Sequence, residues 1–114
     1  MPVSDAIRCA VEAVFAADHR AIVLDGLATI PEASTDSLQQ RPPAEFLQAA
    51  VVALSFGDLA IFEGQLVNAR VEPRDVLYVL ESPGEVQPGL TRGEFRQRYR
   101  DLNLSVPDVL ASDA

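Results

Sequence analysis

Only one cysteine and one histidine occur in the chain, Cys9 and His19, so nucleophilic or soft-metal chemistry would have to involve them. A cysteine beside an activating histidine is a common covalent catalyst. Ten residues of helix would separate these two side chains by about 15 Å along the axis, which is too far for direct proton transfer. A zinc site would need further ligands of the same kinds. The sequence therefore predicts no catalytic, cofactor-binding or metal-binding residue.

Carboxylate pairs such as Asp18/Asp25 and Glu81/Glu85 are the other candidates for acid–base chemistry. Two carboxylates in one pocket can acquire different pKa values and divide the roles of acid and base. No pattern in the sequence places either pair in a shared pocket. The glycines are also isolated, whereas a phosphate-binding loop needs clustered backbone N–H donors. We therefore expect no enzyme activity, and an enzyme with carboxylates in an unrecognised pocket is the alternative.

The arginines are distributed unevenly along the chain. There is no lysine, and four of the nine arginines lie between positions 92 and 100, whereas residues 1–91 carry 13 acidic residues and five arginines. On a helix, Arg92, Arg96 and Arg100 form one row and Arg98 lies on its other flank. Guanidinium groups pair well with carboxylates. We predict that these four arginines face a partner, and the alternative is a solvated helix face neutralised by the chain's own acidic residues.

The overall charge and length limit the class of protein. A formal net charge of −8 at pH 7 disfavours DNA or RNA as a partner, because phosphate binding needs clustered cations. Mimicry of nucleic acid by an acidic surface is an alternative. The length indicates a single domain over residues 1–114. A lone cysteine, no signal-peptide pattern and no membrane-spanning apolar run lead us to expect a cytoplasmic protein without membrane contact or cofactor.

Hydrophobic periodicity and turn signals divide the chain into three helices and five strands. The predicted helices cover residues 5–17, 43–56 and 92–102, and the predicted strands cover residues 21–24, 27–30, 59–62, 65–71 and 75–81. The order α-β-β-α-β-β-β-α predicts an α+β fold with a five-stranded antiparallel sheet covered by helices. A strand over residues 51–56 is an alternative to the second helix.

Outside these elements we expect irregular structure. The ordered core should span residues 4–102, with a polar loop at 31–42 and a loose acidic tail at 104–114. Thr91 and Glu94 form the Ser/Thr-x-x-Glu pattern of a capping box and fix the start of the last helix. Asn103 is expected to end that helix.

The order of elements resembles that of the roadblock/LC7 family. The resemblance spans most of residues 4–102. It lies in the Ile22–Ile30 hairpin around Asp25-Gly26, the alanine-rich helix from Ala44, the strand run from Asp58 to Glu81 and the terminal helix after a Pro-Gly loop. It implies a homodimer that has no catalytic residues of its own and that scaffolds or regulates small Ras-like GTPases. It assigns no contact residue in this chain.

Two functions follow as expectations. The first is a non-enzymatic homodimeric interaction module that regulates or scaffolds a partner protein, with a small Ras-like GTPase as the partner that the resemblance implies. The alternative is a small acidic inhibitor, such as a toxin-immunity or phage anti-defence protein, that covers a basic site on its target. An acidic protein would meet such a site with favourable long-range electrostatics.

Overall fold

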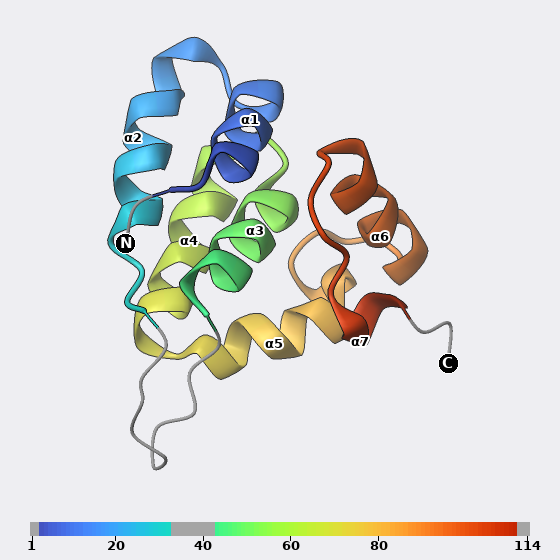
Figure 1. Cartoon of the computed structure of the whole chain (residues 1–114). Helices are drawn as coiled ribbons and strands as arrows, with labels where there is room; N and C mark the ends of the chain where they lie inside the picture. Colours follow the sequence, from blue (N-terminus) through green and yellow to red (C-terminus); the bar gives the residue numbers. More distant parts are fainter. Residues whose placement is uncertain (1–2, 33–42, 112–114) are drawn as a thin grey trace.

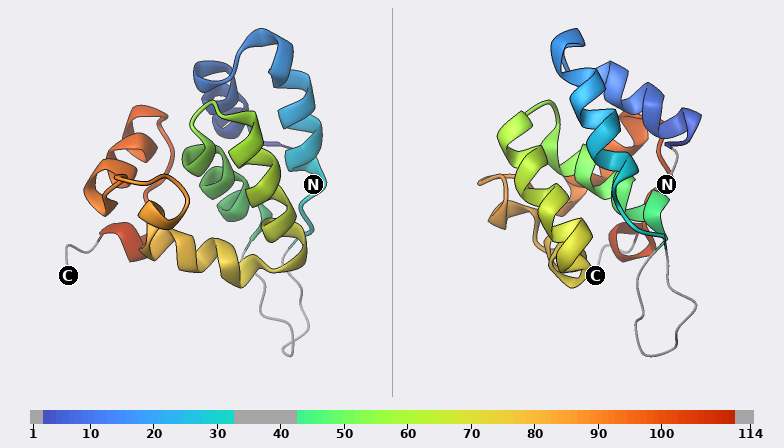
Figure 2. Two further views of the ribbon diagram at one scale, coloured as in Figure 1. Left: turned by 180° about the vertical axis from the view of Figure 1, so that it is seen from behind. Right: turned by 90° about the vertical axis from the view of Figure 1, so that its left-hand side faces the viewer.

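The computed structural model describes residues 3–32 and 43–111, and every regular element in these ranges is helical. The elements are α1 (Asp5–Val14), α2 (Ala17–Ala28), α3 (Ala44–Ser55), α4 (Leu59–Val71), α5 (Pro73–Glu81), the 3₁₀ turn η1 (Pro83–Glu85), α6 (Arg92–Asp101) and α7 (Asp108–Ala111). Helix α3 lies at the centre and contacts α1, α4, α5 and α6 (Figure 1). Helix α5 runs across the lower end of α4 when the molecule is seen from behind (Figure 2).

The predicted α+β fold with its five-stranded antiparallel sheet is wrong, because no strand occurs in the described ranges. The expected hairpin at 21–30 is helix α2 and its C-terminal turn. Val23, Leu27 and Ile30 are fully buried with the i, i+4, i+7 spacing of a helix face. Gly26 faces α4, and a Cβ atom placed there would lie 2.8 Å from Leu66 Cδ2. This glycine therefore permits close packing between two helices and does not form a turn.

The three strands expected between residues 59 and 81 are helices α4 and α5. Asp58 caps α4, because its carboxylate accepts a hydrogen bond from the backbone N–H of Ile61 at 3.1 Å. Pro73 occupies the first turn of α5, where its missing N–H costs nothing. The roadblock/LC7-like pattern is also wrong, because that resemblance depended on the predicted hairpin and on these three predicted strands.

The second predicted helix is confirmed, and the strand alternative for residues 51–56 is wrong. Helix α3 covers Ala44–Ser55, and nine of its side chains are buried. Two side chains from other parts of the chain reach its C-terminal carbonyl groups: Gln87 donates to Leu54 O, and Arg98 donates to Ala53 O at 3.5 Å. The buried end of the central helix thus has hydrogen-bond partners that its own backbone cannot supply.

The other two predicted helices are present, but each ends earlier in the sequence than predicted. Helix α1 stops at Val14, earlier than predicted, because Phe15 is extended and α2 begins at Ala17. Helix α6 starts as predicted, since the hydroxyl oxygen of Thr91 accepts a hydrogen bond from the backbone N–H of Glu94 at 3.1 Å.

Residues 104–111 pack on the core and do not form part of a loose tail. Asn103 adopts a left-handed conformation with φ 57°, and the N–H of Leu104 donates to the carbonyl of Tyr99 at 2.9 Å. This Schellman turn sends the chain back across the molecule. Leu104 and Leu110 are buried as a result, and α7 contacts α5 and α6. Residues 112–114, and 33–42 of the polar loop predicted at 31–42, lie outside the described ranges.

Candidate functional site

Arginine side chains bind the C-terminal ends of this chain's own helices. Arg20 shows the pattern at α1, where it donates to the carbonyl oxygens of Glu12 at 2.9 Å and Phe15 at 3.1 Å. The last turn of a helix carries unpaired carbonyl groups and a partial negative charge, so a guanidinium there is stabilising. Arg20 therefore holds the end of α1 and is not free to face a partner.

Three of the four arginines predicted to face a partner make the same kind of contact. Arg92 donates to the carbonyl of Val109, and Arg96 donates to that of Leu110 at 2.9 Å, both in α7. Arg98 reaches the end of α3, and burial lowers its pKa while nearby Glu94 raises it. Arg100 is exposed. The four therefore do not form one free row, and Arg100 is the member that stays open to solvent.

In contrast to most of these arginines, the acidic side chains are exposed to solvent. Every Asp and Glu side chain within residues 3–32 and 43–111 is exposed, including the pairs Asp18/Asp25 and Glu81/Glu85. Apart from Arg100, the exposed arginines of these ranges are Arg8, Arg70 and Arg74. Because the exposed carboxylates of these ranges outnumber the exposed arginines, the surface offered to another molecule is predominantly anionic.

Exposed apolar side chains gather on helices α4 and α5. Val67 and Val71 of α4 are 49% and 68% exposed, and Leu77 and Tyr78 of α5 are 36% and 57% exposed. Val67 and Val71 are one helical turn apart and share a face of α4. Among the described residues, the other strongly exposed large apolar side chains are Ile22 and Phe56. Exposed apolar groups that cluster mark interaction sites more often than isolated ones do.

Four exposed carboxylates occur in the same segment of the chain, residues 63–81. We define the α4–α5 surface by the exposed side chains of Glu63, Val67, Val71, Glu72, Asp75, Leu77, Tyr78 and Glu81. Two arginines occur in the same segment: Arg70 donates to the hydroxyl of Thr29 at 3.2 Å, and Arg74 is exposed. The α4–α5 surface thus combines exposed apolar side chains with an excess of negative charge.

The soft side chains lie elsewhere. Cys9 is exposed on α1, and His19 is partly exposed near the start of α2. Within residues 3–32 and 43–111, no group of three or more His, Cys, Asp and Glu side chains is placed to hold a metal ion. The α4–α5 surface was not predicted from the sequence, because residues 59–81 were predicted to form strands. The four-residue spacing of Val67 and Val71 is the signal that could have revealed it.

Comparisons with known proteins provide no relative. No protein-family model, no curated protein and no solved structure matches this chain. Among the helices of the described ranges, none is both long enough and apolar enough to cross a bilayer.

Proposed function

We propose that this chain is a non-enzymatic interaction module that binds a cationic surface of a partner protein through its α4–α5 surface. The proposal rests on the contrast between the carboxylates, which are exposed, and the arginines, several of which contact the backbone of the chain itself. Every described carboxylate is exposed, whereas Arg20, Arg92 and Arg98 donate to backbone carbonyls of the chain itself. An anionic surface accelerates the encounter with a cationic one and fixes its orientation. A small acidic protein that covers a basic site on its target would work in this way.

The apolar members of the surface supply binding energy that the carboxylates alone would lack. Exposed ion pairs contribute only about 0–1 kcal/mol each. Burial of apolar area contributes roughly 25 cal/mol per Å². Tyrosine is also among the residues that most often dominate binding energy at protein interfaces. Tyr78, 57% exposed, and Val71, 68% exposed, are thus the expected anchors, surrounded by carboxylates that select a cationic partner.

Self-association through this surface is electrostatically disfavoured. Two copies facing each other would bring Glu63, Glu72, Asp75 and Glu81 of one chain close to the same residues of the other, and opposed like charges destabilise an interface. We therefore propose a monomer that binds a different protein. A role on a Ras-like GTPase rested on the roadblock/LC7 resemblance and is not proposed, because the helical fold contradicts that resemblance.

The first experiment measures mass and salt dependence. Light scattering coupled to size exclusion should give a monomer at tens of micromolar concentration. Proteins captured from the host by the tagged chain are then purified and titrated against it at low and high salt. We expect a partner of high isoelectric point whose affinity falls steeply with ionic strength. A stable dimer of this chain, or a partner whose affinity does not depend on salt, would contradict the proposal.

A matched pair of substitutions locates the contact. Val71→Ser and Ile22→Ser each remove an exposed apolar side chain, the first from the α4–α5 surface and the second from α2. Both should leave the free energy of unfolding nearly unchanged, because surface substitutions usually have small effects. Val71→Ser should weaken partner binding and Ile22→Ser should not. Equal affinities for the two variants would exclude the α4–α5 surface as the contact.

A further inference from the structure

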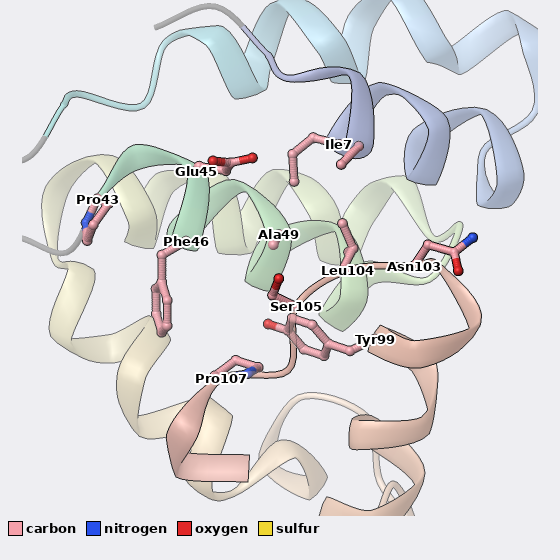
Figure 3. Close-up of a pocket in the computed structure, with 11 residues that line it drawn as sticks. Ile7, Pro43, Glu45, Phe46, Ala49, Tyr99, Asn103, Leu104, Ser105 and Pro107 are labelled. Carbon is pink, nitrogen blue, oxygen red and sulfur yellow. The ribbon is translucent and has the colours of Figure 1, made fainter. Parts of the chain in front are cut away.

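A pocket of about 340 Å³ opens between α1, α3, α6 and the segment that follows α6. Figure 3 shows Ile7 of α1, Phe46 and Ala49 of α3, and Pro107 of the returning segment around it. Its inner wall includes the buried residues Ile7, Tyr99, Leu104 and Pro107, whereas Glu45, Asn103 and Ser105 are exposed. A volume of this size, with an apolar interior and a few polar groups, is typical of small-ligand sites.

The hydroxyl group of Tyr99 is the unexplained feature of this pocket. The Tyr99 side chain is 1% exposed, and its hydroxyl oxygen is buried and has no hydrogen-bond partner among residues 3–32 and 43–111. Figure 3 shows the hydroxyl directed toward the space that Phe46, Ser105 and Pro107 border. Tyrosine hydroxyls that are buried usually find a partner, because an unsatisfied polar group is costly. This donor therefore borders the pocket, and the described residues provide no acceptor for it.

The position of this hydroxyl is fixed by the packing of its ring. The rings of Tyr99 and Phe95 meet edge to face with centroids 5.4 Å apart, and Phe95 is fully buried. The backbone carbonyl of Tyr99 is held by the N–H of Leu104 in the turn that ends α6. A donor that is already oriented loses little freedom when a ligand binds.

The charges around the pocket restrict what the hydroxyl can bind. Glu45 contributes a carboxylate, and none of the described side chains that line the pocket is an arginine, so these residues disfavour an anionic ligand. Burial raises the pKa of Tyr99, so the phenol keeps its proton and acts as a donor. The matching group is a neutral oxygen acceptor on an apolar molecule.

We propose that this pocket binds a small apolar molecule with a neutral carbonyl oxygen, which accepts a hydrogen bond from the hydroxyl of Tyr99. The site is separate from the α4–α5 surface, because the pocket is lined by α1, α3, α6 and residues 103–107. Acetophenone and cumene make a suitable pair of probes, since they have similar shapes and differ by a carbonyl oxygen in place of a methyl group.

The test is a titration of the wild type and of Tyr99→Phe with each probe, followed by the backbone amide signals in NMR. In the wild type, acetophenone should shift the amide signals of Ala49 and Leu104 and should bind more tightly than cumene. The expected ratio of affinities is roughly two- to tenfold, the net effect of one hydrogen bond. In Tyr99→Phe the two probes should bind equally.

A second pair of variants checks that binding occurs in the pocket. Ala49→Phe places a large side chain in it, and Ala60→Phe makes the same change at an exposed position on α4. Ala49→Phe should abolish binding of both probes while Ala60→Phe retains it. An affinity ratio that survives Tyr99→Phe, equal affinities in the wild type, shifts away from the pocket, or no binding of either probe up to its solubility would each overturn the proposal.

Discussion

The guanidinium of Arg98 lies over the ring of Phe56, with its central carbon 4.5 Å from the ring centroid. Phe56 follows α3 and has a left-handed backbone with φ 41° and ψ 51°, which a bulky side chain rarely adopts. The same arginine reaches the carbonyl of Ala53 on the preceding turn. Arg98 therefore connects α6 to the end of the central helix by charge, by stacking and by hydrogen bonding.

Replacing Arg98 by alanine should destabilise the fold modestly. A cation over an aromatic ring contributes about 0.5–1 kcal/mol at a partly exposed site, and the lost packing of the arginine stem adds to it. We expect the free energy of unfolding in urea to fall by about 1 kcal/mol for Arg98→Ala. Arg100→Ala, at an exposed position on the same helix, is the control and should change little. Equal losses for both variants would show that the stack over Phe56 contributes nothing.

Two glycines should respond to alanine in opposite directions. Gly57 has φ 92°, and a Cβ atom there would lie 2.7 Å from the carbonyl oxygen of Val14. Gly57→Ala should cost more than about 1 kcal/mol from the left-handed backbone alone. Gly64 lies within α4, and the space that a Cβ atom would occupy there is open, so Gly64→Ala should stabilise by about 0.5–1 kcal/mol. Thermal melting would check both, and a destabilising Gly64→Ala would argue against the helix assigned to residues 59–71.

The pH dependence of stability should report the environment of Tyr99. Burial raises its pKa in the folded state, so the unfolded chain loses this proton first as the pH increases. The stability it contributes is therefore complete below the unfolded pKa of about 10 and declines as the pH rises above that value. Urea titrations across this range should show a steeper loss for the wild type than for Tyr99→Phe. Tyr78→Phe, at an exposed tyrosine, should behave like the wild type.

Phe95 should be essential for the position of α6. Its side chain is fully buried in the core and packs edge to face with Tyr99. Truncation of a buried phenylalanine typically costs about 3–5 kcal/mol because it leaves a cavity. Phe95→Ala should lower the urea midpoint strongly. Gln97→Ala, an exposed change on the same helix, should shift it only slightly, and a reversal of this order would contradict the assignment of the faces of α6.

Some helix ends could be predicted from local sequence signals, and both predicted ends of α6 are supported by the structure. Thr91 caps α6, and Asn103 takes the left-handed conformation that ends it. Both depend on residues within one turn of the backbone, where side-chain chemistry decides the geometry. The helix at residues 44–55 was predictable for a similar reason, since its alanines favour helix over strand.

The helices at 17–28 and 59–71 were missed because long-range packing overrides their local signals. Asp25-Gly26 is a strong hairpin pattern, yet Gly26 is so close to α4 that a Cβ atom there would lie 2.8 Å from Leu66 and 3.3 Å from Phe62. Exposed apolar residues such as Ile22 and Val67 also obscure the helical period of the buried positions. The apolar residues that obscured α4 belong to the proposed binding surface. The pocket beside Tyr99 could not be predicted, since distant segments of the chain form it.

The most direct test compares two fourfold neutralised variants in titrations with the captured partner. One removes the carboxylates of the α4–α5 surface (Glu63→Gln, Glu72→Gln, Asp75→Asn and Glu81→Gln), and the other removes four from α1 and α2 (Asp5→Asn, Glu12→Gln, Asp18→Asn and Asp25→Asn). Both lose the same net charge. The first should lower the affinity by at least roughly tenfold, since close interfacial charge pairs couple by about 1.5 kcal/mol or more, while the second retains most of it. Equal affinities, or a greater loss in the second variant, would contradict binding through the α4–α5 surface.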